Sequence, residues 1–244
     1  MAERTDEKLK LISDTDFREV YHHFVYIECK EIINDIIKGD VTDEDTGVCA
    51  YGYIDDDAGL SLSVFQLATY KDGKLTTRDL PGNVAMWIFR YHAKYLKNIN
   101  NFDQGKVIMS TLIPDEHYIG DMKELGADLA PFAGIEKTIR ENYDNPSHDK
   151  EELRTEKYSY LDPFRYPACP DEVLVMLFSK NNEPERAWVR CMFAAENEVF
   201  GTLLTEPKAD YKIHKGDMIG FVLYEEGEEK MLVATGHTAR TITQ

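Results

Sequence analysis

The chain has 244 residues and is strongly acidic, with 45 Asp and Glu against 28 Lys and Arg and a formal net charge of −17. This charge repels nucleic-acid phosphates and anionic membrane surfaces, so neither is an expected partner, whereas a basic protein would be attracted. The length suits one large domain or two modest ones, and a hydrophobic fraction of 43% favours a packed core over disorder.

The first half of the chain alternates between helical and strand patterns. Apolar residues at helical spacing predict a helix over about 14–38, although residues 24–27 could be a break in it. Two stretches rich in β-branched and aromatic residues, 48–54 and 60–70, predict an antiparallel meander. Asp72-Gly73 suits a tight turn with positive φ, and the alternative reading of residues 55–59 as a calcium loop lacks the closing glutamate.

Helical spacing returns in the next segment, where Val84, Trp87, Ile88 and Tyr91 would share one face. We therefore expect a second helix over 83–99. A buried strand is predicted over 106–113, followed by a largely helical stretch that ends near Tyr143.

The segment 145–170 holds four prolines and few aliphatic residues, which is typical of a connector. After it, five short strands with polar turns predict a small closed or half-closed barrel. The expected fold class is α+β: an N-terminal domain of helices and a meander (1–144), the connector (145–170), and a five-stranded β module (171–244).

Targeting and redox features favour a cytoplasmic protein. The first ten residues are charged, and no stretch approaches the roughly 18 apolar residues of a membrane-spanning helix. The cysteines are too far apart for a paired zinc site, and their apolar flanks favour buried thiols in a reducing compartment; they are Cys29, Cys49, Cys169 and Cys191.

One group of candidate binding residues is Asp115, Glu116 and His117, which follow a predicted strand end where binding residues collect. Acidic side chains there more often cap a helix, so a metal role is the weaker alternative. No sequence motif for a nucleophilic serine, a phosphate loop or a dinucleotide site is present. The sequence therefore predicts no catalytic residue, no metal site and no cofactor.

A second group of candidate binding residues is Glu185, Arg186 and Trp188, at the start of a predicted strand. Core packing is the simpler explanation of Trp188. The alternative is a recognition surface, because an aromatic side chain flanked by charges at a strand end suits one.

The C-terminal third resembles an uncharacterised bacterial family, domain of unknown function 2314. The resemblance covers residues 184–233 and rests on three short patterns: Glu185-Arg186-x-Trp188-Val189, Gly201-x-Leu203-x-x-x-Pro207 and Gly216-Asp217-x-Ile219-x-Phe221. After Leu223 the chain departs from the family, because an acidic turn over 225–229 replaces the isoleucine- and tryptophan-containing ending of many members. The resemblance implies a small β-rich module without a settled activity.

Two functions are compatible with these features. The first is a non-enzymatic, acidic protein-interaction module that resembles immunity proteins, which neutralise a toxin by covering a basic surface. The second is a small-molecule-binding protein or hydrolase with a site at the domain junction. The simplest alternative is that the acidity serves only to keep the chain soluble. The sequence does not fix the oligomeric state.

Overall fold

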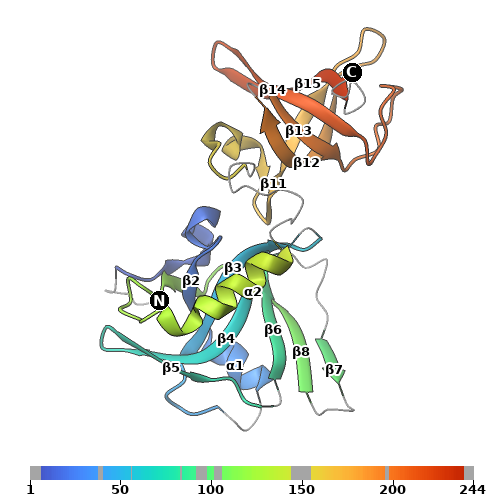
Figure 1. The fold of residues 1–244 in the computed structure, drawn as a ribbon. Coiled ribbons are helices and arrows are strands. Elements are labelled where there is room, and N and C mark those ends of the chain that lie inside the picture. The colour runs from blue at the N-terminus through green and yellow to red at the C-terminus, as the bar shows by residue number, and fades with distance from the viewer. Residues whose placement is uncertain are drawn as a thin grey trace. The chain divides into compact units, whose positions relative to one another are not determined.

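A computed structural model describes residues 7–37, 41–55, 57–82, 84–91, 98–101, 106–143, 155–195 and 198–238. The chain divides into two compact units, Met1–Pro146 and Ser147–Gln244 (Figure 1). No helix among the described residues is long and apolar enough to cross a membrane.

The first unit is built on one twisted sheet, which has nine strands within the described residues. All neighbouring pairs are antiparallel except β6 and β8, which run parallel. The strands follow the order β1-β9-β2-β3-β4-β6-β8-β7, with β5 pairing the far half of β4. Their bounds are β1 (Lys10–Leu11), β2 (Phe24–Glu28), β3 (Gly47–Asp55), β4 (Gly59–Lys71), β5 (Lys74–Asp79), β6 (Val84–Arg90), β7 (Asn98–Asn101), β8 (Lys106–Leu112) and β9 (Tyr118–Asp121).

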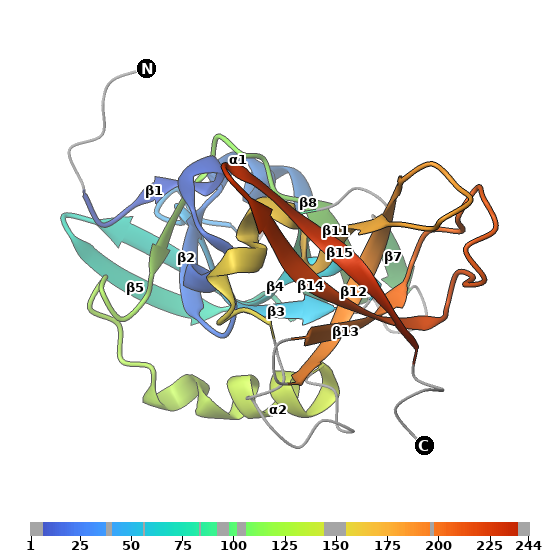
Figure 2. The same ribbon diagram turned by 90° about the horizontal axis from the view of Figure 1, so that it is seen from above.

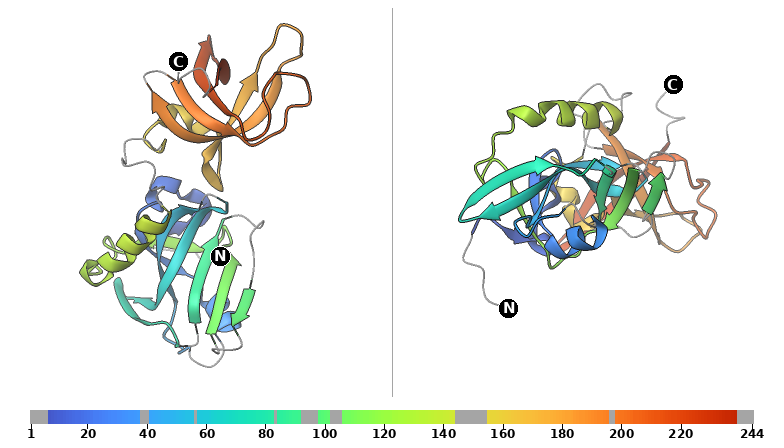
Figure 3. Two further views of the ribbon diagram at one scale, coloured as in Figure 1. Left: turned by 45° about the vertical axis from the view of Figure 1, so that its right-hand side comes forward. Right: turned by 90° about the horizontal axis from the view of Figure 1, so that it is seen from below.

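Two short helices cover opposite faces of this sheet (Figures 1 and 2). Helix α1 (Lys30–Ile36) contributes Ile33 to one core, which contains Val48 and Ala50 of β3. Helix α2 (Ala133–Tyr143) contributes Ile139 to the other core, which is rich in aromatic rings. Figure 3 shows the same layering from two further directions. Because both faces are covered, β3 is buried at every position but its last.

The predicted helix over 14–38 is wrong. The segment contains two 3-10 turns, η1 (Ile12–Asp14) and η2 (Phe17–Glu19), then β2 and α1. Helical continuity is broken at His22, whose φ is 62°, where the backbone crosses β3 at Gly52. A Cβ at Gly52 would lie 1.8 Å from the Val20 carbonyl oxygen, so only glycine permits this close crossing.

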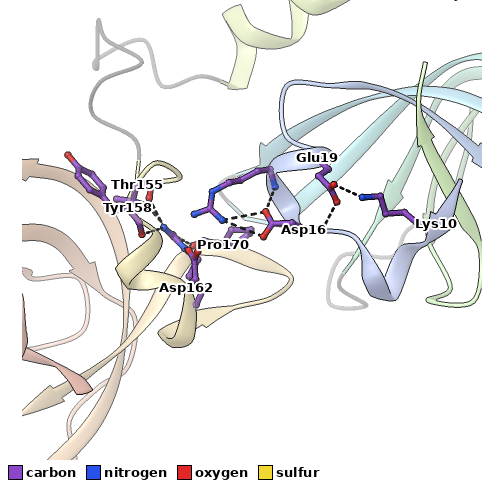
Figure 4. Close-up of polar contacts among 9 residues, drawn as sticks. Lys10, Asp16, Glu19, Thr155, Tyr158, Asp162 and Pro170 are labelled. Carbon is purple, nitrogen blue, oxygen red and sulfur yellow. Dashed lines mark hydrogen bonds and ion pairs between the residues drawn. The ribbon is translucent and has the colours of Figure 1, made fainter. Parts of the chain in front are cut away.

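A helix-capping interaction does occur in this segment, at Asp16 and Glu19. The Asp16 carboxylate accepts from the Arg18 backbone N–H at 2.8 Å, and the Glu19 carboxylate accepts from the Asp16 N–H at 3.0 Å (Figure 4). This capping box closes only the single turn η2.

The predicted helix over 83–99 is also wrong, because β6 and β7 occupy the described part of it. Trp87 and Phe89 point into one core, whereas Ile88 is buried on the other face, where Met86 is 45% exposed; side chains therefore alternate between the two faces, as in a strand. The predicted helical stretch after β8 is helical only at its end: β9 and a 3-10 turn, η4 (Ala130–Phe132), precede α2. Since strands dominate and the helices are short, the chain is mainly β and the α+β class is wrong.

The meander and its turn are confirmed. Strands β3 and β4 form one hairpin, and Asp72 and Gly73, both with positive φ, connect β4 to β5. At the β3–β4 turn the Asp55 carboxylate accepts from the Asp57 and Ala58 N–H groups at 3.0 and 2.9 Å, which is an ordinary hairpin cap rather than an ion loop.

An ion pair between the buried Asp45 and the partly exposed Arg78 ties the loop before β3 to the edge strand β5. The Asp45 side chain is only 2% exposed and accepts from the Arg78 Nε at 2.9 Å and from the Thr42 backbone N–H at 2.7 Å. Burial alone would raise the pKa of Asp45, but the bonds from Arg78 and Thr42 outweigh it and lower the pKa below its ordinary value.

The second unit is a closed five-stranded barrel, as the sequence predicts. Strands β11 to β15 are antiparallel neighbours in sequence order, and the first and last close the ring in parallel, with Val175 beside Leu232. The short β10 pairs antiparallel with the beginning of β11 and is not one of the five ring strands. The bounds are β10 (Arg165–Tyr166), β11 (Cys169–Leu177), β12 (Glu185–Ala195), β13 (Glu198–Leu203), β14 (Met218–Glu226) and β15 (Glu229–Thr238).

The described part of the predicted connector, residues 155–170, packs onto the barrel. Its 3-10 segment η6 (Ser159–Phe164) inserts Leu161 into the barrel core. Arg165, whose side chain is 5% exposed, donates to Asp162 Oδ1 at 2.8 Å and to the carbonyl oxygens of Thr155, Tyr158 and Pro170 at 2.5, 3.3 and 2.5 Å. Figure 4 shows these four acceptors gathered around one point, so a single guanidinium holds the segment in place.

Candidate functional site

The residues Asp115, Glu116 and His117 lie in the turn between β8 and β9 of the first unit. The turn supports the fold through its backbone: the Asp115 carbonyl accepts from the Ser13 N–H at 3.2 Å, and the His117 carbonyl accepts from the Ile12 N–H at 2.9 Å. The Asp115 and Glu116 side chains are exposed. The turn therefore anchors the segment Ile12–Asp14 while presenting two carboxylates to solvent.

The His117 imidazole is the unusual member of this turn. Both of its ring nitrogens are shielded from solvent and have no hydrogen-bond partner among the described residues, and the Tyr91 hydroxyl shares this condition. Burial, together with the nearby Asp115 charge, raises the pKa of Tyr91, so its phenol stays protonated. The described residues contain no group of three or more His, Cys, Asp or Glu able to hold a metal ion.

The candidate residue Glu185 has a structural task in the second unit. Its carboxylate accepts from the backbone N–H of Lys208 at 3.0 Å through either oxygen and lies 3.4 Å from the N–H of Ala209. These bonds hold the long loop between β13 and β14 against the start of β12. Glu185 is therefore part of the scaffold beside the candidate surface.

Arg186 and Trp188 lie on the outside of the barrel. Their neighbours Ala187 and Val189 are buried in the barrel core, and side chains alternate between the two faces of a strand. Trp188 is half-buried, pairs with Leu174 across the β11–β12 ladder, and packs edge-on against Tyr166 with ring centroids 5.8 Å apart. Arg186 is exposed and pairs with Met176.

The strand register extends this outer surface across four strands. Met176 pairs with Val233 of β15, Val233 pairs with Val222 of β14, and Met231 pairs with Tyr224. None of these side chains belongs to the barrel core, and none is fully buried. We call this surface the outer apolar face; it comprises Leu174, Met176, Trp188, Val222, Tyr224, Met231 and Val233.

Carboxylates border the outer apolar face on one side. Glu172, Glu226 and Glu229 occupy the next outward positions of β11, β14 and β15, and we call them the acidic rim. Glu172 accepts from Arg190 Nη2 at 2.9 Å, and Glu226 accepts from the Tyr224 hydroxyl at 2.9 Å. Glu226 and Glu229 face each other across the hairpin, an arrangement that like-charge repulsion disfavours within the fold itself.

Three of the four cysteines are unsuited to nucleophilic chemistry. Cys29, Cys49 and Cys191 are buried, and burial is the largest cause of the rise in each thiol pKa, to about 12 at Cys191. These thiols stay protonated near neutral pH and pack as small apolar side chains.

Sequence reasoning favoured core packing for Trp188, with a surface position only as the alternative, and it missed the outward-facing neighbours of Trp188. One signal was available in the sequence. Strands β11, β14 and β15 carry apolar residues at both odd and even positions, although a barrel strand needs them only on its inner face. Arg165 was missed altogether, because its acceptors are mostly backbone carbonyls that leave no mark in the sequence.

The sequence was compared with models of known protein families, with curated proteins and with solved structures, and no match was found. The resemblance of residues 184–233 to domain of unknown function 2314 stays a prediction.

Proposed function

We propose that this chain is a non-enzymatic binding protein for a basic protein partner and acts in the manner of an immunity protein. Support comes first from the formal charge of −17, which would accelerate the encounter with a basic partner and disfavour acidic ones. Charge of this size acts at long range, but it does not by itself select one partner.

The observation that carries the proposal is the acidic rim beside the outer apolar face. Charged groups steer association and set register, while buried apolar and aromatic side chains supply most of the binding energy of an interface. Trp188 and Tyr224 are residue types that commonly anchor interfaces. A surface that combines both features suits a partner that is basic around an apolar centre.

Capture at low salt tests this proposal. The tagged chain should retain a basic protein that is released by roughly 0.5–1 M salt, because screening shortens the range of charge interactions to about 3 Å at 1 M. The captured protein is then purified and titrated into the chain by calorimetry at two salt concentrations. A matched variant with Glu226→Gln and Glu229→Gln should bind it more weakly and with a smaller salt dependence.

Two results would contradict the proposal. Retention of no protein at low salt is one, and retention of a set that resists high salt is the other.

A further inference from the structure

We infer that the outer apolar face is the docking surface for an amphipathic, positively charged helical segment of the partner. The inference rests on the proposed function and adds to it a place on the molecule and a chemistry for the bound segment. Apolar side chains of the segment would lie on Trp188, Met231 and Tyr224, and its lysine or arginine side chains would lie along the acidic rim.

The dimensions of the face fit a helix. It crosses β12, β11, β15 and β14, and three interstrand spacings of about 4.8 Å give roughly 14 Å. Along the strands it covers two outward positions, about 7 Å apart. A helix with its side chains is about 10 Å wide and advances 5.4 Å per turn, so about three turns laid across the strands would cover the face.

The topology argues against an added strand as the occupant. Each of the four strands already has a neighbour on both sides, because β11 and β15 close the ring. A partner therefore finds no free row of backbone donors and acceptors here and must be bound through side chains, as in helix recognition by an apolar groove or face.

Charge argues against a second copy of this chain as the occupant. Two copies joined through this face would each bring an acidic rim and a net charge of −17. Like charges held together at an interface disfavour it, whereas a cationic segment relieves the opposition of Glu226 and Glu229 within the free hairpin.

A designed peptide can test the inference on the full chain. The probe is a 14-residue helix of leucine and lysine with one apolar and one cationic side, and the controls are a scrambled peptide of the same composition and an oligolysine of equal charge. Binding is read from the fluorescence of Trp188 in a Trp87→Phe background. We expect the amphipathic peptide to bind at least tenfold more tightly than either control and to shift the emission to shorter wavelength.

Paired variants locate the site. Tyr224→Ser with Met231→Ser should weaken binding of the amphipathic peptide at least tenfold. The matched control is Met86→Ser with Leu112→Ser in the first unit, where these side chains are 45% and 41% exposed. This control should leave peptide binding unaltered. Glu226→Gln with Glu229→Gln provides a conservative third variant that keeps the hairpin and should reduce both the affinity and its salt dependence.

The outcomes separate this inference from the proposed function. Two results would overturn the docking surface. One is equal binding of the amphipathic and scrambled peptides, and the other is an effect of the Met86 and Leu112 variant as large as that of the Tyr224 and Met231 variant. The proposed function would survive either result if a basic protein were still captured in a salt-sensitive way. Dimerisation of the wild-type chain that Tyr224→Ser and Met231→Ser abolish would also overturn the docking surface. Peptide binding at this face without any salt-sensitive partner would support the surface and contradict the proposed function.

Discussion

Replacing Arg165 by methionine should lower the free energy of unfolding of the second unit far more than replacing an exposed arginine. The guanidinium makes hydrogen bonds to four residues while its side chain is 5% exposed. Methionine keeps much of the volume but leaves the carbonyl oxygens of Thr155, Tyr158 and Pro170 without this donor. Breaking one buried charged pair typically costs about 3–5 kcal/mol, and Asp162, with 36% of its side chain exposed, recovers hydration that limits the loss. We expect a loss of about 4 kcal/mol.

Urea unfolding followed by Trp188 fluorescence measures this loss. All variants carry Trp87→Phe, so the signal comes from the barrel alone and the cost of that change cancels between variants. Arg186→Met serves as the matched control, because Arg186 is exposed, and it should change the free energy of unfolding by less than about 0.5 kcal/mol. Arg165→Lys keeps the charge without the planar fork and should fall between the two. A loss below about 1 kcal/mol for Arg165→Met would refute the reasoning.

Three further predictions concern titration and reactivity. Asp45→Asn should lower the free energy of unfolding by about 2 kcal/mol, less than a fully buried pair because the Arg78 side chain is 40% exposed. Since the folded pKa of Asp45 lies below its ordinary value of 3.8, the wild-type advantage in urea melts should persist above about pH 4 and disappear as the pH falls further. The hydrogen bond to Glu206 is the main cause that raises the pKa of His214. An NMR titration should therefore give a His214 pKa above 6.5, and Glu206→Gln should lower that pKa. A thiol reagent at neutral pH should modify Cys29, Cys49 and Cys191 only after unfolding, and rapid labelling of any of them in the native chain would contradict their burial.

The barrel could be predicted because its strands are short and separated by polar turns. Each of the five predicted strands is found, and the Gly227 turn within 225–229 joins the last two, with Gly227 at a φ of 64°. Closure is also consistent with the prediction, since a barrel leaves no exposed edges in its ring.

The helix over 83–99 was predicted wrongly because a strand with apolar side chains on both faces loses its alternation. In β6 the apolar residues from Val84 to Phe89 are nearly continuous, and the subset Val84, Trp87, Ile88 and Tyr91 fits helical spacing equally well. The deciding fact is tertiary: Trp87 and Phe89 lie in the core that contains Ile33 of α1, and Ile88 is buried on the opposite face, so β6 carries apolar residues at both odd and even positions.

The candidate site was only partly accessible to sequence reasoning. The charged neighbours of Trp188 offered a surface position only as the alternative to core packing. Glu185 proved to bind backbone N–H groups of a loop more than twenty residues away. The outer apolar face depends on the register between β11 and β15, which are distant in sequence, and no local pattern encodes that register.

The parallel pairing of β11 with β15 has a consequence for how the second unit opens. In an open sheet the outermost strand can fray while the remainder stays intact. Here every strand of the ring has a paired neighbour on both sides. Separating Met176 from Val233 exposes two rows of backbone groups at once and uncovers the core between them. Amide hydrogen exchange in β15 should therefore require unfolding of the whole barrel, and its protection would equal the global free energy of that unit.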